Sequence, residues 1–206
     1  MVNIGVLISG NGTNLQSIID AIKEHEIDGE IKLVISNKED AYGLVRCQKE
    51  NIESLFINPK DYDDITYNRR IMEEFNKRNV ELVVLAGYLK ILSKEFIKSF
   101  ENRIINIHPS LIPSFSGKGY YGERVHKAVL DYGVKYTGAT VHFVDEGTDT
   151  GPIILQEVVV VDENDTVDSL REKVLKVEHK LLVKAVGLYC KNKLRVVGRK
   201  VIIDKE

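Results

Sequence analysis

Short, continuous apolar runs alternate with helix-patterned segments through the first half of this 206-residue chain. Residues 2–8 form an apolar run that no charged residue interrupts, whereas Leu15, Ile18, Ile19 and Ile22 follow the i, i+3, i+4, i+7 spacing of one helix face. Apolar strands separated by helices are typical of a parallel sheet that helices cover on both faces. We therefore expect an α/β fold.

The same alternation continues up to residue 107. Further strands are expected at Ile31–Ser36, Glu53–Ile57, Glu81–Ala86 and Arg103–Ile107, and further helices at Ala41–Asn51 and Asp61–Arg78. Of these strands, ELVVLA at 81–86 is the most hydrophobic. The first half is therefore expected to supply the parallel part of the sheet.

The second half changes character. Tyr136–Asp145 and Ile153–Val161 are longer strands joined by EGTDTGP, which favours an antiparallel extension of the sheet. Thr166–Lys191 keeps helical spacing, with Asp165 or Thr166 as a possible N-cap. The segment LRVVGRKVII, residues 194–203, reads as a closing hairpin with glycine in its turn.

The composition fits one globular domain over residues 1–206, because 43% of the residues are hydrophobic, 29% are charged and no Pro- or Ser-rich linker divides the chain. The net charge of -2 gives no sign of the basic surface that a nucleic acid requires. No apolar run approaches the roughly 18 to 20 residues of a membrane span. The N-terminal residues read as a strand and not as a signal peptide.

The two cysteines, Cys47 and Cys190, lie far apart and outside any CxxC pair. A zinc knot and a disulfide framework are therefore excluded, and buried filler is the simpler role for both thiols. This cysteine usage makes the cytoplasm the expected compartment.

The first candidate site is SGNGTN, Ser9–Asn14, between the first strand and the first helix. Backbone N–H groups at such a turn can bind an anion. Leu15 stands where a dinucleotide fingerprint has its third glycine, and no GK[ST] follows. A single phosphate, as on a sugar phosphate, is the better ligand. The alternative is a tight turn in which Thr13 or Asn14 caps the helix.

The second candidate is NIHPSLIPSFSGKG, Asn106–Gly119, which leaves a strand end and enters a long loop. Ligands of open α/β sheets bind at the carboxyl ends of the strands. Asn106 and His108 are two residues apart, so an extended chain places them on one side. Asn106 can donate a neutral hydrogen bond, and His108 can titrate near pH 7. A structural histidine and a turn-forming asparagine are the alternatives.

The third candidate is VHFVDEGTDTG, where Asp145, Glu146 and Asp149 lie in one loop. These acids can bind a metal, orient a histidine or form a solvated turn, and their spacing does not decide between these roles. No pair of histidines has metal-ligand spacing, so we expect no metal site. His142 is interpreted as a core or supporting histidine, and His126 as a surface residue of an amphipathic helix.

Six segments together resemble the phosphoribosylglycinamide formyltransferase family, which uses 10-formyltetrahydrofolate in purine synthesis. They are ISGNGTNLQSIIDA, ISNK, VVLAGYLKILS, INIHPSLIPSF, TVHFVDEGTDTGPIILQ and KVEHKLL, in the family's order. The resemblance implies a Rossmann-like formyltransferase fold: a mostly parallel central sheet flanked by helices, with an antiparallel C-terminal extension. It also implies ribonucleotide phosphate binding in the N-terminal half, folate binding in the C-terminal half, and an active site between them.

The resemblance also implies roles for individual residues. Asn106, His108 and Asp149 resemble the family's catalytic trio. The resemblance also implies a cis peptide bond between Ile112 and Pro113. Glycinamide ribonucleotide would be bound by Gly12, Thr13, Asn14 and Glu178. Folate would be bound by Leu89, Lys90, Ile91, Leu92, Asn106, Val144, Asp145 and Glu146.

The residue that would bind the charged folate tail differs from the one in some family members. Asp64 stands where those members carry an arginine, and Lys60 in NPKDY is the residue that would supply the positive charge instead.

The reaction that the resemblance implies is direct attack of the amine on the formyl carbon, without a covalent enzyme intermediate or a metal. Asp149 would favour the imidazolium form of His108 and raise its pKa, whereas burial would lower that pKa. The expected partners are the two small-molecule substrates, with no nucleic acid or membrane, and the protein is expected as a monomer or homodimer. A formyl-folate hydrolase and a sugar-phosphate binding module are the alternatives.

Overall fold

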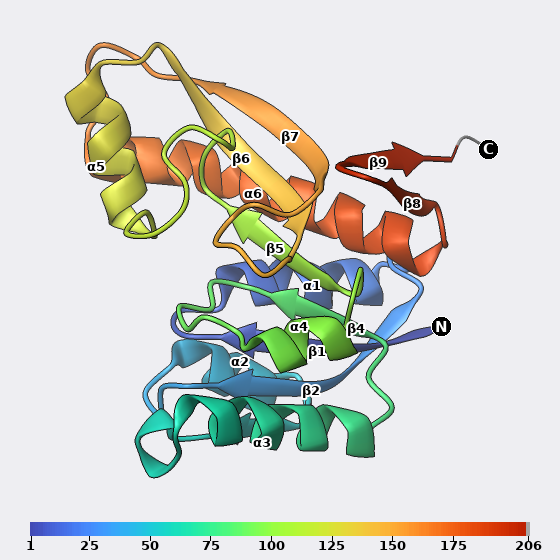
Figure 1. Ribbon diagram of the computed structural model, residues 1–206. Helices are drawn as coiled ribbons and strands as arrows, with labels where there is room; N and C mark the ends of the chain where they lie inside the picture. Colours follow the sequence, from blue (N-terminus) through green and yellow to red (C-terminus); the bar gives the residue numbers. More distant parts are fainter. Residues whose placement is uncertain (205–206) are drawn as a thin grey trace. The chain divides into compact units, whose positions relative to one another are not determined.

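The computed structural model describes residues 1–204 of the chain (Figure 1). The chain divides into two compact units, the first of which is Met1–Ile105 and the second of which begins at Asn106. Each unit has its own strands, helices and apolar core. The expectation of a single domain stays a prediction.

The first unit is built on a parallel sheet. Its four strands are β1 (Val2–Ile8), β2 (Gly29–Ser36), β3 (Ser54–Phe56) and β4 (Leu82–Leu85). Their order is β3-β2-β1-β4, and each of the three neighbouring pairs is parallel. The strand ends that follow Ile8 and Leu85 therefore emerge at the same edge of the sheet.

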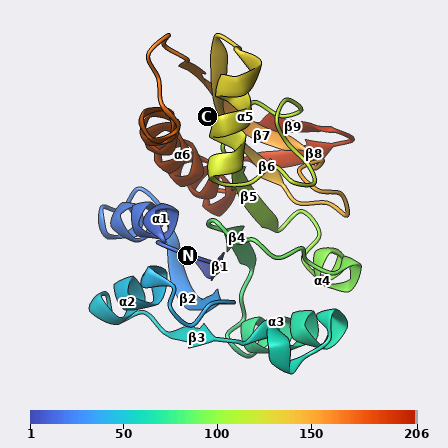
Figure 2. The same ribbon diagram turned by 90° about the vertical axis from the view of Figure 1, so that its left-hand side faces the viewer.

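Helices cover both faces of this sheet. They are α1 (Thr13–Lys23), α2 (Tyr42–Lys49), α3 (Asp64–Lys77) and α4 (Lys94–Ser99). Figure 2 shows α1 and α2 on one face and α3 and α4 on the other. The single helix expected at 61–78 is instead a short 3-10 helix, η1 (Pro59–Asp61), followed by α3. The break falls at Asp63, whose side chain caps α3 by accepting from the Thr66 N–H.

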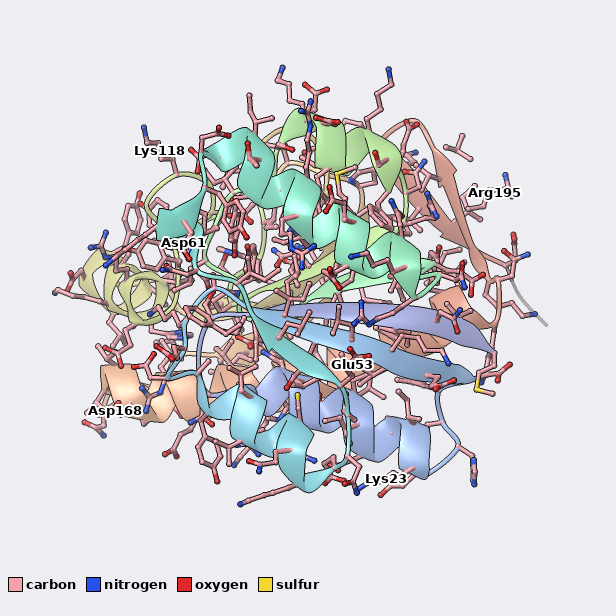
Figure 3. The ribbon with its side chains drawn as sticks, turned by 90° about the horizontal axis from the view of Figure 1, so that it is seen from below. Lys23, Glu53, Asp61, Lys118, Asp168 and Arg195 are labelled. Atoms are coloured by element: carbon pink, nitrogen blue, oxygen red, sulfur yellow. The ribbon has the colours of Figure 1, made fainter. Side chains whose placement is uncertain are left out.

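The core of the first unit joins the strands to α3 and α4. Phe75 packs edge-on against Phe96 and Phe100, and the side chains of β4 are buried along its whole length. Charged side chains such as Lys23 and Asp61 lie on the outside (Figure 3). This division between apolar core and charged surface is what the periodicity of the sequence predicts.

The second unit carries the antiparallel strands. β5 (Ile104–His108) runs across the boundary between the two units. β6 (Tyr136–Phe143) and β7 (Ile153–Val160) pair antiparallel, as do β8 (Leu194–Val197) and β9 (Lys200–Ile203). Only Ile153 and Lys200 pair in the parallel contact of β7 with β9.

Two helices complete the second unit, α5 (Glu123–Tyr132) and α6 (Val167–Cys190). Thr166 caps α6 in a reciprocal capping box with Ser169, so the second of the two candidate caps is confirmed. In Figure 1, α6 runs along the β6–β7 hairpin. The predicted α/β class, with a parallel sheet flanked by helices and antiparallel C-terminal strands, is confirmed. The Ile112–Pro113 bond is cis, as predicted.

Candidate active site

Asn106 and His108 come from β5, at the point where the strand ends. His108 is buried, whereas Asn106 is the one half-buried residue of the strand. The loop after His108 is folded by two hydroxyls: Ser110 Oγ donates to the Ser114 carbonyl at 2.6 Å, and Thr140 Oγ1 donates to the Ser110 carbonyl at 2.7 Å. This loop returns the Phe115 carbonyl to His108.

Both ring nitrogens of His108 face hydrogen-bond acceptors. Nε2 lies 2.9 Å from the Phe115 carbonyl, so this nitrogen carries the proton and donates. Nδ1 lies 3.5 Å from Asp149 Oδ2. A neutral imidazole can donate from only one nitrogen, so only the imidazolium can satisfy both acceptors.

Asp149 reaches His108 from a loop that is held in a specific shape. Its backbone has φ 57°, in the left-handed region that Asp tolerates better than most residues. The Gly117 N–H donates to its Oδ2 at 2.9 Å. A Cβ on Gly151 would collide with the Phe143 carbonyl, so this glycine permits the loop to lie against the end of β6. The carboxylate is therefore oriented by contacts within the protein.

His142 links Asn106 to Asp149. Its Nδ1–H donates to the Phe143 carbonyl at 2.8 Å, so its Nε2 is the accepting nitrogen of the neutral ring. Asn106 Nδ2 donates to this nitrogen at 3.1 Å, and Asp149 Oδ1 lies 3.7 Å from it. One of the two amide N–H bonds of Asn106 orients the side chain, which leaves the second for a substrate.

The pKa values of this cluster favour a neutral histidine beside an ionised acid. Burial lowers the pKa of His108 below its ordinary value and outweighs the opposing influence of Asp149 and of the Phe115 carbonyl. Burial would raise the pKa of Asp149, but His142, His108 and the Gly117 N–H together hold it below its ordinary value. Of the two opposing effects expected on His108, burial is the larger.

Asp145, another acid of the 145–149 loop, bonds within the loop. Asp145 Oδ1 accepts from the Gly147 N–H at 3.1 Å and from Thr150 Oγ1 at 2.5 Å, so it shapes the loop. Glu146 is exposed and Val144 is half-buried. Within residues 1–204, no group of three or more His, Cys, Asp and Glu side chains is arranged to hold a metal ion.

The candidate phosphate loop lies in the first unit, between β1 and α1. Gly12 is the N-cap residue of α1, with φ 73° and no side-chain cap, so neither Thr13 nor Asn14 caps this helix. The first turn of α1 has no acidic residue. Asn14 is buried, and Thr13 is half-buried. The start of α1 therefore keeps the positive end of its dipole available to an anion.

Ser9 connects this loop to residues 89–92, the candidate folate wall. Its hydroxyl donates to Asn37 Oδ1 at 2.6 Å and accepts from the Leu89 N–H at 2.9 Å. Leu89 and Ile91 are 52% and 77% exposed, whereas Leu92 is buried. The exposed pair is thus available to a flat apolar ligand, and Leu92 belongs to the core.

The charge near this wall comes from Lys90. Its Nζ lies 3.3 Å from Asp64 Oδ1 and 5.2 Å from the centre of the Tyr67 ring. Lys60 is an exposed residue of η1. Asp64 therefore has a cationic partner within the first unit, and that partner is Lys90.

Glu178 lies on the buried face of α6, in the second unit. A carboxylate at only 8% exposure is unusual, and this burial distinguishes Glu178 from the solvated acids of the same helix.

His126 was expected on the surface, and this expectation is wrong. It is 3% exposed, and its Nδ1 has no hydrogen-bond partner among the residues that the structure describes. Burial, Arg171 and His108 lower the pKa of His126 to about 4. The helix face that carries Val125 and Val129 was recognisable in the sequence, but the packing that buries the adjacent histidine was not.

We expect His126 to make the second unit sensitive to acid. The unfolded chain takes up this proton as the pH falls through about 6.5, but the folded chain does not until about pH 4. The free energy of unfolding should therefore fall by about 2 to 3 kcal/mol more in the wild type than in His126→Gln between pH 7 and pH 4.5. Urea unfolding at both pH values measures this difference, with the exposed His25→Gln as control. Equal losses in the wild type and in His126→Gln would contradict the assignment.

Comparison with known proteins assigns the family. The model of the formyl transferase family, described as "Formyl transferase", matches residues 2–186. The chain belongs to this family. The match covers β1 to most of α6, so it includes the Ser9–Asn14 loop and the cluster around His108. The resemblance seen in the sequence motifs is confirmed at the level of the family.

Individual relatives agree with this assignment. The chain is 37% identical to phosphoribosylglycinamide formyltransferase of Bacillus subtilis (strain 168), over 87% of this chain and 90% of that protein. It is 42% identical to the chloroplastic enzyme of that name from Vigna unguiculata, of whose length it covers 63%. The crystal structure of glycinamide ribonucleotide transformylase 1 from Symbiobacterium toebii has a TM-score of 0.94 and 43% identity, covering 100% of this chain and 95% of that one.

The sequence alone left His142 between a core role and a supporting role, and its contacts with Asn106 and Asp149 favour the supporting role. His142 and Thr140 are two residues apart on β6, and both are buried polar residues on one side of the strand. This spacing was the available signal, but it also fits a core histidine. For residues 1–204, no helix is both long enough and apolar enough to cross a membrane.

Proposed function

We propose that this protein transfers the formyl group of 10-formyltetrahydrofolate to the amine of 5'-phosphoribosylglycinamide, a step of purine synthesis. The observation that carries the proposal is the cluster in which Asp149 Oδ2 lies 3.5 Å from His108 Nδ1 and Asn106 donates to His142. The names of relatives that match over most of this chain support the same activity.

The reaction joins the amine nitrogen to the formyl carbon and breaks the bond from that carbon to the folate nitrogen. The tetrahedral intermediate carries a negative oxygen, and one proton passes from the attacking nitrogen to the departing nitrogen. A neutral donor and a titratable group close together are suited to these two tasks.

Asn106 is proposed to stabilise the negative oxygen with the amide N–H that His142 leaves unused. His108, when protonated, would also stabilise the oxygen by its positive charge. To give a proton to the departing nitrogen, one of its ring N–H groups would exchange its protein acceptor for that nitrogen. The lowered pKa of His108 makes the imidazolium a stronger acid, and Asp149 opposes the effect of burial by favouring the charged form. No covalent enzyme intermediate is required.

The remaining candidates would bind the two substrates. Gly12, Thr13 and Asn14 are proposed to bind the ribonucleotide phosphate, with Glu178 as a further contact to this substrate. Leu89, Lys90 and Ile91 are proposed as contacts to the folate, and so are residues 144–146. Binding energy from the phosphate, remote from the reaction, would orient the amine.

The activity is tested by following 10-formyltetrahydrofolate with and without phosphoribosylglycinamide. Consumption only in the presence of the amine supports the proposal. Consumption without the amine would instead indicate a formyl-folate hydrolase. No consumption in either case would leave a sugar-phosphate binding module as the better interpretation.

The phosphate loop is tested by Thr13→Asp. The new carboxylate lies in the first turn of α1, where it favours the helix but repels a bound phosphate. We expect the KM for phosphoribosylglycinamide to rise by about tenfold or more, because like charges a few ångströms apart cost on the order of 1 to 4 kcal/mol. The KM for the formyl donor should stay unchanged.

Thr13→Asn is the matched control, since it has the same shape without the charge. Tight binding of NAD by the wild type would contradict the interpretation of this loop as a site for one phosphate.

A further inference from the structure

Arg46, on α2, contacts the Ser9–Asn14 loop through two of its guanidinium nitrogens and α1 through the third. Nε donates to the Asn11 carbonyl at 2.8 Å, and one terminal nitrogen donates to Asn11 Oδ1 at 2.9 Å. The other donates to Gln16 Oε1 at 3.2 Å, and the guanidinium lies 5.1 Å from the centre of the Tyr42 ring. These contacts restrict the rotamers of the Arg46 side chain. Arg46 can therefore hold Asn11 in one position.

The backbone of α2 also approaches the loop closely. The Gly43 N–H donates to the Gly10 carbonyl at 3.1 Å. A Cβ on Gly12 would lie 2.7 Å from Gly43 Cα, and a Cβ on Gly43 would collide with Ile8 Cδ1. Glycine at both positions is therefore what allows the first turn of α2 to contact this loop.

These contacts determine the direction of the loop's peptide groups. The carbonyls of Gly10 and Asn11 both point toward α2, because Gly43 and Arg46 donate to them. In a trans peptide the carbonyl and the next N–H point in opposite directions. The N–H groups of Asn11 and Gly12 therefore point away from α2, as an anion-binding concavity requires.

The Gly12 carbonyl also has a fixed direction. Gly12 C=O accepts from the Gln16 N–H at 2.9 Å, which is the first turn of α1. The N–H of Thr13 consequently points out of the helix N-terminus, in line with the helix dipole.

We propose that Arg46 is a positioning residue for the phosphate subsite: its hydrogen bonds to Asn11 hold the loop in the conformation that presents backbone N–H groups to the substrate's phosphate. This inference rests on the proposed function of the Gly12–Asn14 segment. Arg46 acts through Asn11 and does not itself touch the reacting atoms.

Arg46→Ala removes the hydrogen bonds to Asn11 and leaves the reacting cluster of the second unit unaltered. We expect the KM for phosphoribosylglycinamide to rise by about tenfold or more, since charge-assisted pairs are roughly twice as strong as neutral ones. The kcat and the KM for the formyl donor should change by less than about twofold. A fall in kcat with an unchanged KM for the ribonucleotide would overturn the proposal.

Two further variants separate positioning from simple charge attraction. Arg46→Lys keeps the charge but lacks the planar fork of donors that meets the carbonyl and Oδ1 of Asn11, so it should restore only part of the affinity. Lys49→Ala removes a positive charge three residues away on the same helix, where the side chain lies over Tyr42 and does not contact the loop. If Arg46→Lys behaves as the wild type and Lys49→Ala as Arg46→Ala, charge attraction and not positioning is the cause.

Binding of inorganic phosphate tests the same residue without the reaction. In the wild type, the amide NMR signals of Asn11, Gly12 and Thr13 should shift as phosphate is added. These shifts should need about tenfold more phosphate in Arg46→Ala. If the alanine variant does not fold, Arg46→Lys should need more phosphate than the wild type, by a smaller factor.

This measurement distinguishes the two proposals. The amide signals could shift with phosphate in a manner that depends on Arg46, while the protein does not formylate phosphoribosylglycinamide. This result would refute the proposed activity but not the positioning role of Arg46. Formylation with a ribonucleotide KM and phosphate shifts that Arg46 does not influence would refute the positioning alone.

Discussion

Asp149→Asn is expected to lower kcat/KM for formyl transfer by about 100-fold to 10,000-fold, the range typical for the loss of a positioned acid–base group. The substitution removes the charge that faces His108 Nδ1 at 3.5 Å. It keeps an oxygen that can accept from the Gly117 N–H, so the loop can retain its shape. Binding of phosphate at Gly12–Asn14 should survive.

The same variant should change the titration of His108. Burial already lowers the pKa of His108, and Asp149 is the largest influence that opposes burial. Without this carboxylate the pKa should fall further, so a smaller fraction of His108 is protonated at pH 7. NMR of the imidazole between pH 4 and pH 8 measures this shift, and kcat/KM over the same range shows whether activity follows it.

Asp131→Asn is the control for Asp149→Asn. Asp131 is an exposed residue of α5 that pairs with Lys127, so its charge is expected to influence His108 little. The double variant of His108→Ala with Asp149→Asn should lose much less activity than the product of the two single losses, because the pair acts as a unit. If Asp149→Asn leaves both rate and titration unchanged, Asp149 is only a turn residue and the proposed mechanism is wrong.

Most helices and strands could be predicted because the apolar pattern of a buried strand differs clearly from that of a helix face. Apolar runs such as β4 and the helix face of α1 leave little ambiguity between strand and helix. α4 was not predicted, because six residues with two buried side chains, Phe96 and Ile97, are too short to show a period. The start of α3 was misplaced because Pro59–Asp61 satisfies its own hydrogen bonds as a 3-10 helix.

The candidate site was predictable only in part, for a different physical reason. Asn106 and His108 share one strand, so their two-residue spacing places them together without knowledge of the fold. His142 lies near them because β6 is the neighbour of β5 in the sheet, and Asp149 because the 145–151 loop folds back toward His108. The local spacing of residues encodes neither arrangement. The burial of His126 likewise depends on packing within the second unit, where Arg171 of α6 influences its pKa.

Asn106→Asp is expected to lower kcat by about 100-fold to 1,000-fold or more, the loss typical when one donor to a developing oxyanion is removed. The side chains have nearly the same shape, but the carboxylate has no N–H and carries a negative charge. That charge would lie where the reaction itself develops negative charge, so the transition state is penalised more than the bound substrates. The KM values for both substrates should therefore change much less than kcat.

Asn102→Asp is the control for this substitution, because it makes the same chemical change on an exposed residue four positions before Asn106. It should retain the activity of the wild type. Single-turnover measurements on both variants report the chemical step without product release. A normal rate for Asn106→Asp would mean that Asn106 does not contact the oxyanion, and His108 would then be the principal donor. In that case the contact between Asn106 and His142 would serve only to hold the His142 ring beside Asp149.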